Sequence, residues 1–67
     1  MIEIVVNGER CETPAGASLV DLVAQLQLPS QRIAIELNLA IVPKAVWSAT
    51  ILQAGDKLEI VHFVGGG

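Results

Sequence analysis

Cys11 and His62 are the side chains whose types suit nucleophilic catalysis, and the sequence has no other cysteine or histidine. They fall on different predicted strands, so a thiol–imidazole pair is geometrically possible, but no acid is convincingly placed to orient the imidazole. A lone cysteine is more often a small core residue than a nucleophile. His62 fits a partly covered strand position better than that of a general base. The two residues therefore predict structural roles, and we expect no catalytic residue.

Metal and phosphate sites have recognisable spacings, and the sequence lacks them. A metal site needs three or four clustered ligands, and neither of the spacings that commonly supply them, C-x-x-C and H-x-x-x-H, occurs. The run Gly65-Gly66-Gly67 is followed by no helix N-terminus that could cradle a phosphate. We predict that the chain binds no metal and no cofactor of its own.

The same glycine run is informative because it ends the sequence. A frayed terminus is the ordinary interpretation. The alternative is a narrow stalk, since Val64 to Gly67 extend about 13 Å beyond the predicted last strand. Glycine has no Cβ, so a narrow channel in another protein can close around such a segment.

The reactive group on this stalk is the α-carboxylate of Gly67. A carboxylate is a poor electrophile, but an ATP-dependent partner can convert it to an acyl-adenylate with AMP as the leaving group. A sulfur nucleophile can then displace AMP and leave a C-terminal thiocarboxylate. ATP would be used by that partner, and the domain itself would serve as a handle.

Composition and charge exclude several classes of protein. The 67 residues are 52% hydrophobic, 16% charged and 3% aromatic, which suits one small globular domain and not a disordered chain. A formal net charge of −3 and scattered cations argue against nucleic-acid binding and favour a basic protein partner. The apolar runs are too short for a membrane helix. A single cysteine forms no internal disulfide, so the cytoplasm is the expected compartment.

The first half of the sequence predicts a hairpin and a helix. Residues 2–6 and 9–13 alternate as strands around Asn7-Gly8, a dipeptide that favours a type I′ turn. Ser18 and Asp21 have capping-box spacing, and the following apolar residues recur on one face. We expect a helix of about ten residues from Ser18, ended by Pro29.

The second half predicts further strands. Residues 33–37, 41–42 and 57–63 have strand patterns, and Trp47 is expected to fold back on the core. This order predicts an α+β fold of the ubiquitin-like β-grasp type, a mixed sheet of about four or five strands packed on one helix. We expect a domain over residues 1–63 and a flexible Gly-Gly tail over 64–67.

A docking surface is predicted beside the tail. If Leu58 and Ile60 pack under the helix, Val61 and Phe63 face away from it, as does Val5 across the sheet. An exposed apolar patch of this kind often marks a partner site. We therefore predict Val5, Val61 and Phe63 as a docking patch.

The sequence resembles the thiamine-biosynthesis sulfur carrier family (ThiS) over essentially its whole length. The resemblance lies in Asn38, Ile41-Val42-Pro43-Lys44, Trp47, Leu52, Gly55-Asp56, Leu58-Glu59-Ile60-Val61 and Val64-Gly65-Gly66-Gly67. Leu39 stands where this family commonly has glycine, and Lys44 where it commonly has arginine. Both departures lie away from the tail.

The resemblance implies a carrier and co-substrate rather than an enzyme. Gly67 would be adenylated by an E1-like enzyme and thiocarboxylated with sulfur from a persulfide donor protein. Thiazole synthase would then receive the sulfur for the thiazole ring of thiamine. Gly65, Gly66 and Val64 would be threaded into the partners' sites.

Three other interpretations remain open at this point. The small subunit of molybdopterin synthase has the same fold and chemistry, although this chain is short for that family. A ubiquitin-like modifier would join lysines through Gly67. A plain β-grasp binding module would make no use of the tail. The roles of Cys11, Lys44 and His62 toward partners also stay open.

Overall fold

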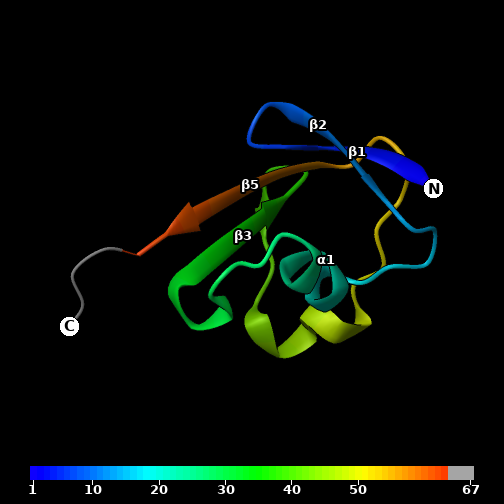
Figure 1. Ribbon diagram of the computed structural model, residues 1–67. Coiled ribbons are helices and arrows are strands. Elements are labelled where there is room, and N and C mark those ends of the chain that lie inside the picture. Colours follow the sequence, from blue (N-terminus) through cyan, green and yellow to red (C-terminus); the bar gives the residue numbers. More distant parts are fainter. Residues whose placement is uncertain (64–67) are drawn as a thin grey trace.

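The computed structural model describes residues 1–63, and Val64 to Gly67 lie outside the described residues. In chain order the elements are β1 (Ile2–Val6), β2 (Glu9–Thr13), α1 (Leu19–Gln25), the 3₁₀ turn η1 (Ser30–Arg32), β3 (Ile33–Leu37), β4 (Ala40–Ile41), the 3₁₀ turn η2 (Lys44–Ala49) and β5 (Lys57–His62). The five strands form one sheet in the order β2-β1-β5-β3-β4, and α1 lies across one face of it (Figure 1). The sheet is mixed because β1 and β5 run parallel, while the other three pairs of neighbouring strands run antiparallel. The predicted β-grasp architecture is confirmed.

The first hairpin has the predicted turn. Asn7 and Gly8 have φ of 50° and 82°, so both occupy the left-handed region that a type I′ turn requires. Val6 then pairs with Glu9, and the register continues to Ile2 opposite Thr13. This register places Ile4 and Cys11 on the helix-facing side of the sheet.

The helix begins as predicted. Ser18 is its N-cap: the Asp21 N–H donates to Ser18 Oγ at 3.2 Å, and the Ser18 N–H donates to Asp21 Oδ2 at 2.9 Å. These reciprocal bonds satisfy two backbone donors that the first turn leaves free. Leu19 and Leu22 on the apolar face are completely buried against the sheet.

The predicted helix end is wrong: α1 ends at Gln25, well before Pro29. Gln27 adopts φ of 57° and its N–H donates to the Ala24 carbonyl at 3.1 Å, while the next N–H donates to the Val23 carbonyl at 3.1 Å. This pair of bonds is a Schellman cap, which satisfies carbonyls at the helix end. The helix has seven residues because the cap closes it before the proline can act.

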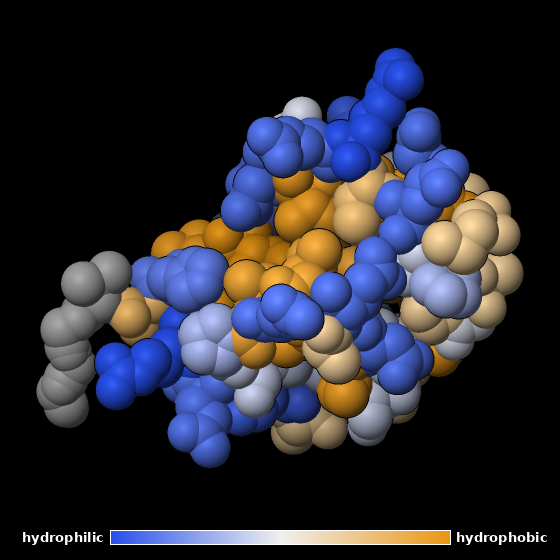
Figure 2. Space-filling view, in the orientation of Figure 1, coloured by the Kyte–Doolittle hydropathy of each residue, from blue (hydrophilic) through white to orange (hydrophobic). Residues whose placement is uncertain are grey.

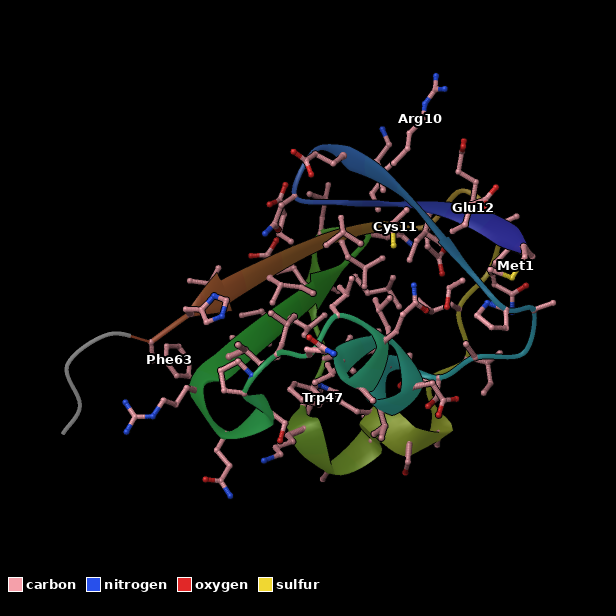
Figure 3. All side chains as sticks on the ribbon, viewed as in Figure 1. Met1, Arg10, Cys11, Glu12, Trp47 and Phe63 are labelled. Carbon is pink, nitrogen blue, oxygen red and sulfur yellow. The ribbon has the colours of Figure 1, made fainter. Side chains whose placement is uncertain are left out.

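The core lies between α1, the sheet and η2. Trp47 folds back as predicted, is only 2% exposed, and donates its indole N–H to the Val42 carbonyl at 2.9 Å. Figure 3 shows its ring beneath α1, on the side of η2. The other buried apolar residues of this cluster are Ile4, Leu19, Leu22, Val23, Ile33, Ile35, Leu52, Leu58 and Ile60. Within residues 1–63 no helix is long and apolar enough to span a bilayer.

The turn between β3 and β4 contains a strained leucine. Asn38 and Leu39 have φ of 51° and 74°, and Leu39 is 91% exposed, so its side chain gains little from packing. Leu39→Gly is expected to raise the free energy of unfolding by about 0.5–1 kcal/mol, because glycine adopts this φ without a Cβ clash. Urea denaturation measures the change. Leu39→Ala keeps the clash and should give no such gain; equal stabilisation by both variants would contradict the argument.

Candidate functional site

The candidate site begins where β5 ends. The residues predicted to be modified and threaded, Gly67 with Val64, Gly65 and Gly66, lie outside the described residues. The structure does describe their attachment point, Phe63, at the projecting end of β5 (Figures 1 and 3). The Phe63 N–H donates to the Arg32 carbonyl at 2.7 Å, which continues the β3–β5 ladder by one residue. The tail is therefore attached to a residue that the sheet holds.

The structure brings together two of the three residues predicted for docking. Val61 and Phe63 are 56% and 59% exposed and alternate on the face of β5 away from the helix. Ala34 pairs with Val61 and extends this surface onto β3. Val5 shares the face but is half-buried and pairs with Lys57, four residues before Val61 and so about 13 Å along the strand. Val5 therefore lies outside the exposed apolar surface that Val61, Phe63 and Ala34 form beside the attachment point of the tail.

Carboxylates dominate the charge on this outer face. Strand register places six charged residues there: the acids Glu3, Glu12, Glu36 and Glu59, and the bases Arg10 and Lys57. Acidic groups beside an exposed apolar pair suit a partner surface with an apolar pocket and surrounding cations. Docking at this surface stays a prediction.

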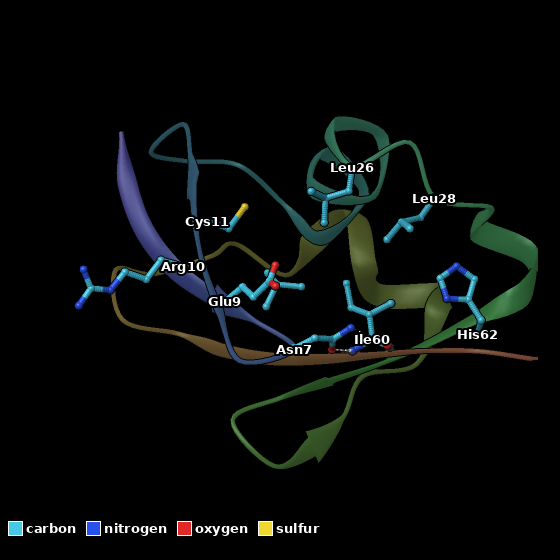
Figure 4. A pocket seen from close by; sticks show the side chains of 9 residues that line it. Asn7, Glu9, Arg10, Cys11, Leu26, Leu28, Ile60 and His62 are labelled. Carbon is cyan, nitrogen blue, oxygen red and sulfur yellow. Dashed lines mark hydrogen bonds between the residues drawn. The ribbon is translucent and has the colours of Figure 1, made fainter.

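The opposite, helix-facing side of the sheet has a hollow. Its volume is about 380 Å³, and Figure 2 shows apolar surface gathered across the middle of this face. The hollow lies between the β1–β2 hairpin, the end of α1 and β5 (Figure 4). Val6, Asn7, Glu9, Arg10, Cys11, Leu26, Leu28, Ile60 and His62 line it. Arg10 contributes only at the edge, because its side chain points away from the hollow (Figure 4).

Cys11 and His62 both line the hollow, yet the structure does not pair them. Cys11 lies opposite Ile4, and the β1–β5 register places Ile4 level with Asp56. His62 is six residues farther along, or about 20 Å, at the other end of the hollow (Figure 4). The Cys11 thiol instead lies 3.9 Å from Gln25 Nε2. No group of three or more potential metal ligands occurs within residues 1–63.

Asn7 has a second role that the sequence does not predict. Its residue type predicts only the turn, but its side chain also bonds to the backbone of Ile60 in β5. The two residues are 53 positions apart, so local sequence gave no signal for this contact.

The chain is similar to known proteins in both sequence and fold. A family model described as the ThiS family matches residues 4–67. A thiazole synthase of Paramagnetospirillum magneticum is 41% identical over 98% of this chain, and the sulfur carrier protein ThiS of Escherichia coli is 29% identical over 98% of this chain and 100% of its own. A crystal structure of the thiamine biosynthesis protein ThiS from Geobacter metallireducens superimposes with a TM-score of 0.86 at 25% identity, covering 98% of this chain and 100% of that one.

The thiazole synthases are much longer than the present sequence. The chain matches 20% of the length of the Paramagnetospirillum protein and 20% of a second thiazole synthase, from Magnetococcus marinus, which is 38% identical. In these two proteins a segment of this kind is therefore part of a larger polypeptide.

Proposed function

The chain belongs to the ThiS family, and from this premise we propose that it is a sulfur carrier in thiamine biosynthesis whose Gly67 carboxyl group carries the sulfur. The observation that carries the proposal is that the family match includes the terminal glycines, since it extends to residue 67. The attachment of the tail to the end of a paired strand supports it, because a fixed root lets the domain present the tail to a partner. The domain acts as a carrier and co-substrate, and its partners do the catalysis.

The proposed chemistry has three steps. The Gly67 carboxylate attacks the α-phosphorus of ATP on an E1-like enzyme, which forms an acyl-adenylate and releases pyrophosphate. The terminal sulfur of a protein persulfide then displaces AMP, and cleavage of the resulting S–S bond by a thiol leaves a thiocarboxylate on Gly67. The thiocarboxylate sulfur then bonds to a carbon of the thiazole precursor, and water hydrolyses the resulting thioester, which leaves the sulfur on the precursor and regenerates the Gly67 carboxylate.

Thiazole synthase is the proposed acceptor. Support comes from the two thiazole synthases that contain a segment similar to this chain, because covalent linkage keeps a carrier at a high local concentration beside its acceptor. The E1-like enzyme and the persulfide donor are proposed from the chemistry that Gly67 requires. The cytoplasm stays the expected compartment, and ATP stays a substrate of the activating partner.

Intact mass spectrometry tests the function directly. The mass of the untreated chain first establishes that it ends at Gly67 with a free carboxyl group. After incubation with ATP, a persulfide donor and the activating enzyme, we expect a mass gain equal to the exchange of one oxygen for sulfur, confined to the last peptide. An unchanged last peptide in the presence of an active enzyme would count decisively against the proposal.

The outer face of β5 gives a separate prediction about docking. Phe63→Ser is expected to weaken binding of the chain to the activating enzyme about tenfold, because an exposed aromatic beside the tail can fill a pocket on the partner. The unfolding midpoint should barely change, since Phe63 is 59% exposed. Isothermal titration calorimetry measures the affinity.

Val20→Ser is the matched control for this prediction. Val20 is also an exposed apolar residue, 45% accessible, but it lies on α1, across the sheet from the outer face. Its replacement should leave binding unchanged. Equal affinities of the Phe63 variant and the unmodified chain would remove Phe63 from the docking surface.

A further inference from the structure

The end of β5 is held differently on its two sides. On the β3 side, backbone pairing continues to Ile33 opposite His62 and then to the hydrogen bond of Phe63. On the β1 side, backbone pairing stops at Val6 opposite Leu58, because the chain turns away at the next residue. The β5 residues after Leu58 therefore have β3 as a neighbour on one side and no strand on the β1 side.

The side chain of Asn7 takes the place of the missing strand. The Ile60 N–H donates to Asn7 Oδ1 at 2.7 Å, and Asn7 Nδ2 donates to the Ile60 carbonyl at 3.1 Å (Figure 4). The Asn7 backbone N–H makes the last backbone bond of the β1–β5 pairing, to the Leu58 carbonyl at 2.9 Å. Asn7 thus bonds to Leu58 through its backbone and to Ile60 through its side chain, and both of these β5 residues face the helix. The side-chain bonds extend the hydrogen bonding between the hairpin and β5 beyond the end of β1.

We infer that Asn7 is a positioning residue for the tail, because it fixes the direction in which β5 delivers the chain to the partner's site. This inference rests on the proposed function of Gly67. Ile60 is three residues before Phe63, so the bonds from Asn7 hold β5 close to the point where residues 64–67 are attached. A fixed attachment point reduces the conformational freedom that docking of the tail has to remove.

Asn38 provides a matched comparison within the same fold. It also has a left-handed φ, 51°, in a hairpin turn, and its side chain also bonds to the β5 backbone. Its Oδ1 accepts from the Lys57 N–H at 3.0 Å, which is the first residue of β5. Asn38 Nδ2 donates instead to Asp56 Oδ1, at 3.1 Å. Both asparagines therefore bond to the β5 backbone, Asn38 at its first residue and Asn7 at its fourth, so only the Asn7 bonds lie toward the tail.

The experiment compares Asn7→Gly with Asn38→Gly. Glycine keeps each turn conformation and removes only the carboxamide. In an assay of pyrophosphate release by the activating enzyme, we expect Asn7→Gly to raise the KM for the carrier about tenfold with kcat retained, because ordering the strand end would then oppose binding. Asn38→Gly should change KM less than about twofold at a comparable loss of stability, measured by urea denaturation.

Amide hydrogen exchange, followed by NMR, separates the inference from the proposed function. Asn7→Gly should accelerate exchange of the Ile60 and Phe63 amides about tenfold, and Asn38→Gly should accelerate only the Lys57 amide. If the unmodified chain elicits no pyrophosphate release, the proposed function fails, while these exchange rates still decide whether Asn7 holds the strand end. An unchanged rate at Phe63, or equal KM changes in the two variants, would overturn the inference.

Discussion

Deletion of Gly66 and Gly67 is expected to abolish sulfur loading, by at least about 100-fold, and to leave the folded domain intact. The remaining carboxyl group would lie on Gly65, about 7 Å short of the position that an extended tail gives to Gly67. A misplacement of even about 1 Å can cost a reacting group about 100-fold in rate. Intact mass after treatment with ATP, persulfide donor and activating enzyme measures the loading, and the urea midpoint measures the fold.

A second variant separates the length of the tail from its width. Gly66→Ala keeps the reach of the carboxyl group and adds one methyl group to the segment. If the partner's channel closes tightly around the glycines, this variant should load about tenfold more slowly, while remaining able to load completely. Rapid loading of the deletion variant would contradict the assignment of Gly67 as the modified residue.

The deletion also distinguishes the rival functions. A plain β-grasp binding module would bind its partner as before, because its surface is unchanged. A ubiquitin-like modifier would lose lysine conjugates of higher mass that the unmodified chain forms. For the molybdopterin-synthase alternative the loading chemistry would be the same, so the synthase that co-purifies with the chain decides between the two pathways.

The features that the sequence predicted well depend on neighbouring residues. The Asn7-Gly8 turn follows from two residues that tolerate a positive φ, and the start of α1 follows from Ser18 and Asp21 bonding reciprocally. The alternation in β5 correctly separated Ile60, buried under the helix, from Val61, exposed on the outer face. These interactions span a few residues, so composition and spacing suffice to identify them.

Of the features that the sequence missed, one has a local cause and two depend on contacts between distant segments. Gln27 ends the helix in a left-handed conformation that glycine usually adopts, so residue type gave no warning. Strand alternation groups Val5 with Phe63 because both face outward, but the parallel register that separates them is fixed only when β1 and β5 pair. Asn7 could be recognised as a turn residue, yet its bond to Ile60 depends on that same pairing.

The sequence predicts the burial of Trp47 but not the tertiary contacts that hold its side chain. Trp47→Ala is expected to lower the free energy of unfolding by about 3–5 kcal/mol, because it leaves a cavity beneath α1. A domain of this size has a total stability of only about 3–10 kcal/mol. The variant should therefore be largely unfolded at 37 °C and poorly loaded with sulfur. Far-UV circular dichroism in urea is the suitable measurement, because the chain has no second tryptophan for fluorescence.

Two further variants show whether the loss of stability in Trp47→Ala arises from the missing indole or from a disturbed η2 turn. Trp47→Phe keeps most of the apolar volume but leaves the Val42 carbonyl without its donor, so a smaller loss of about 1–3 kcal/mol is expected. Val46→Ala alters the neighbouring residue of η2, which is 46% exposed, and should cost less than about 1 kcal/mol. If Trp47→Ala cost no more than Val46→Ala, the indole would not be what joins η2 to the core. The packing of α1 on the sheet would then be sufficient to keep folded the domain that carries the tail.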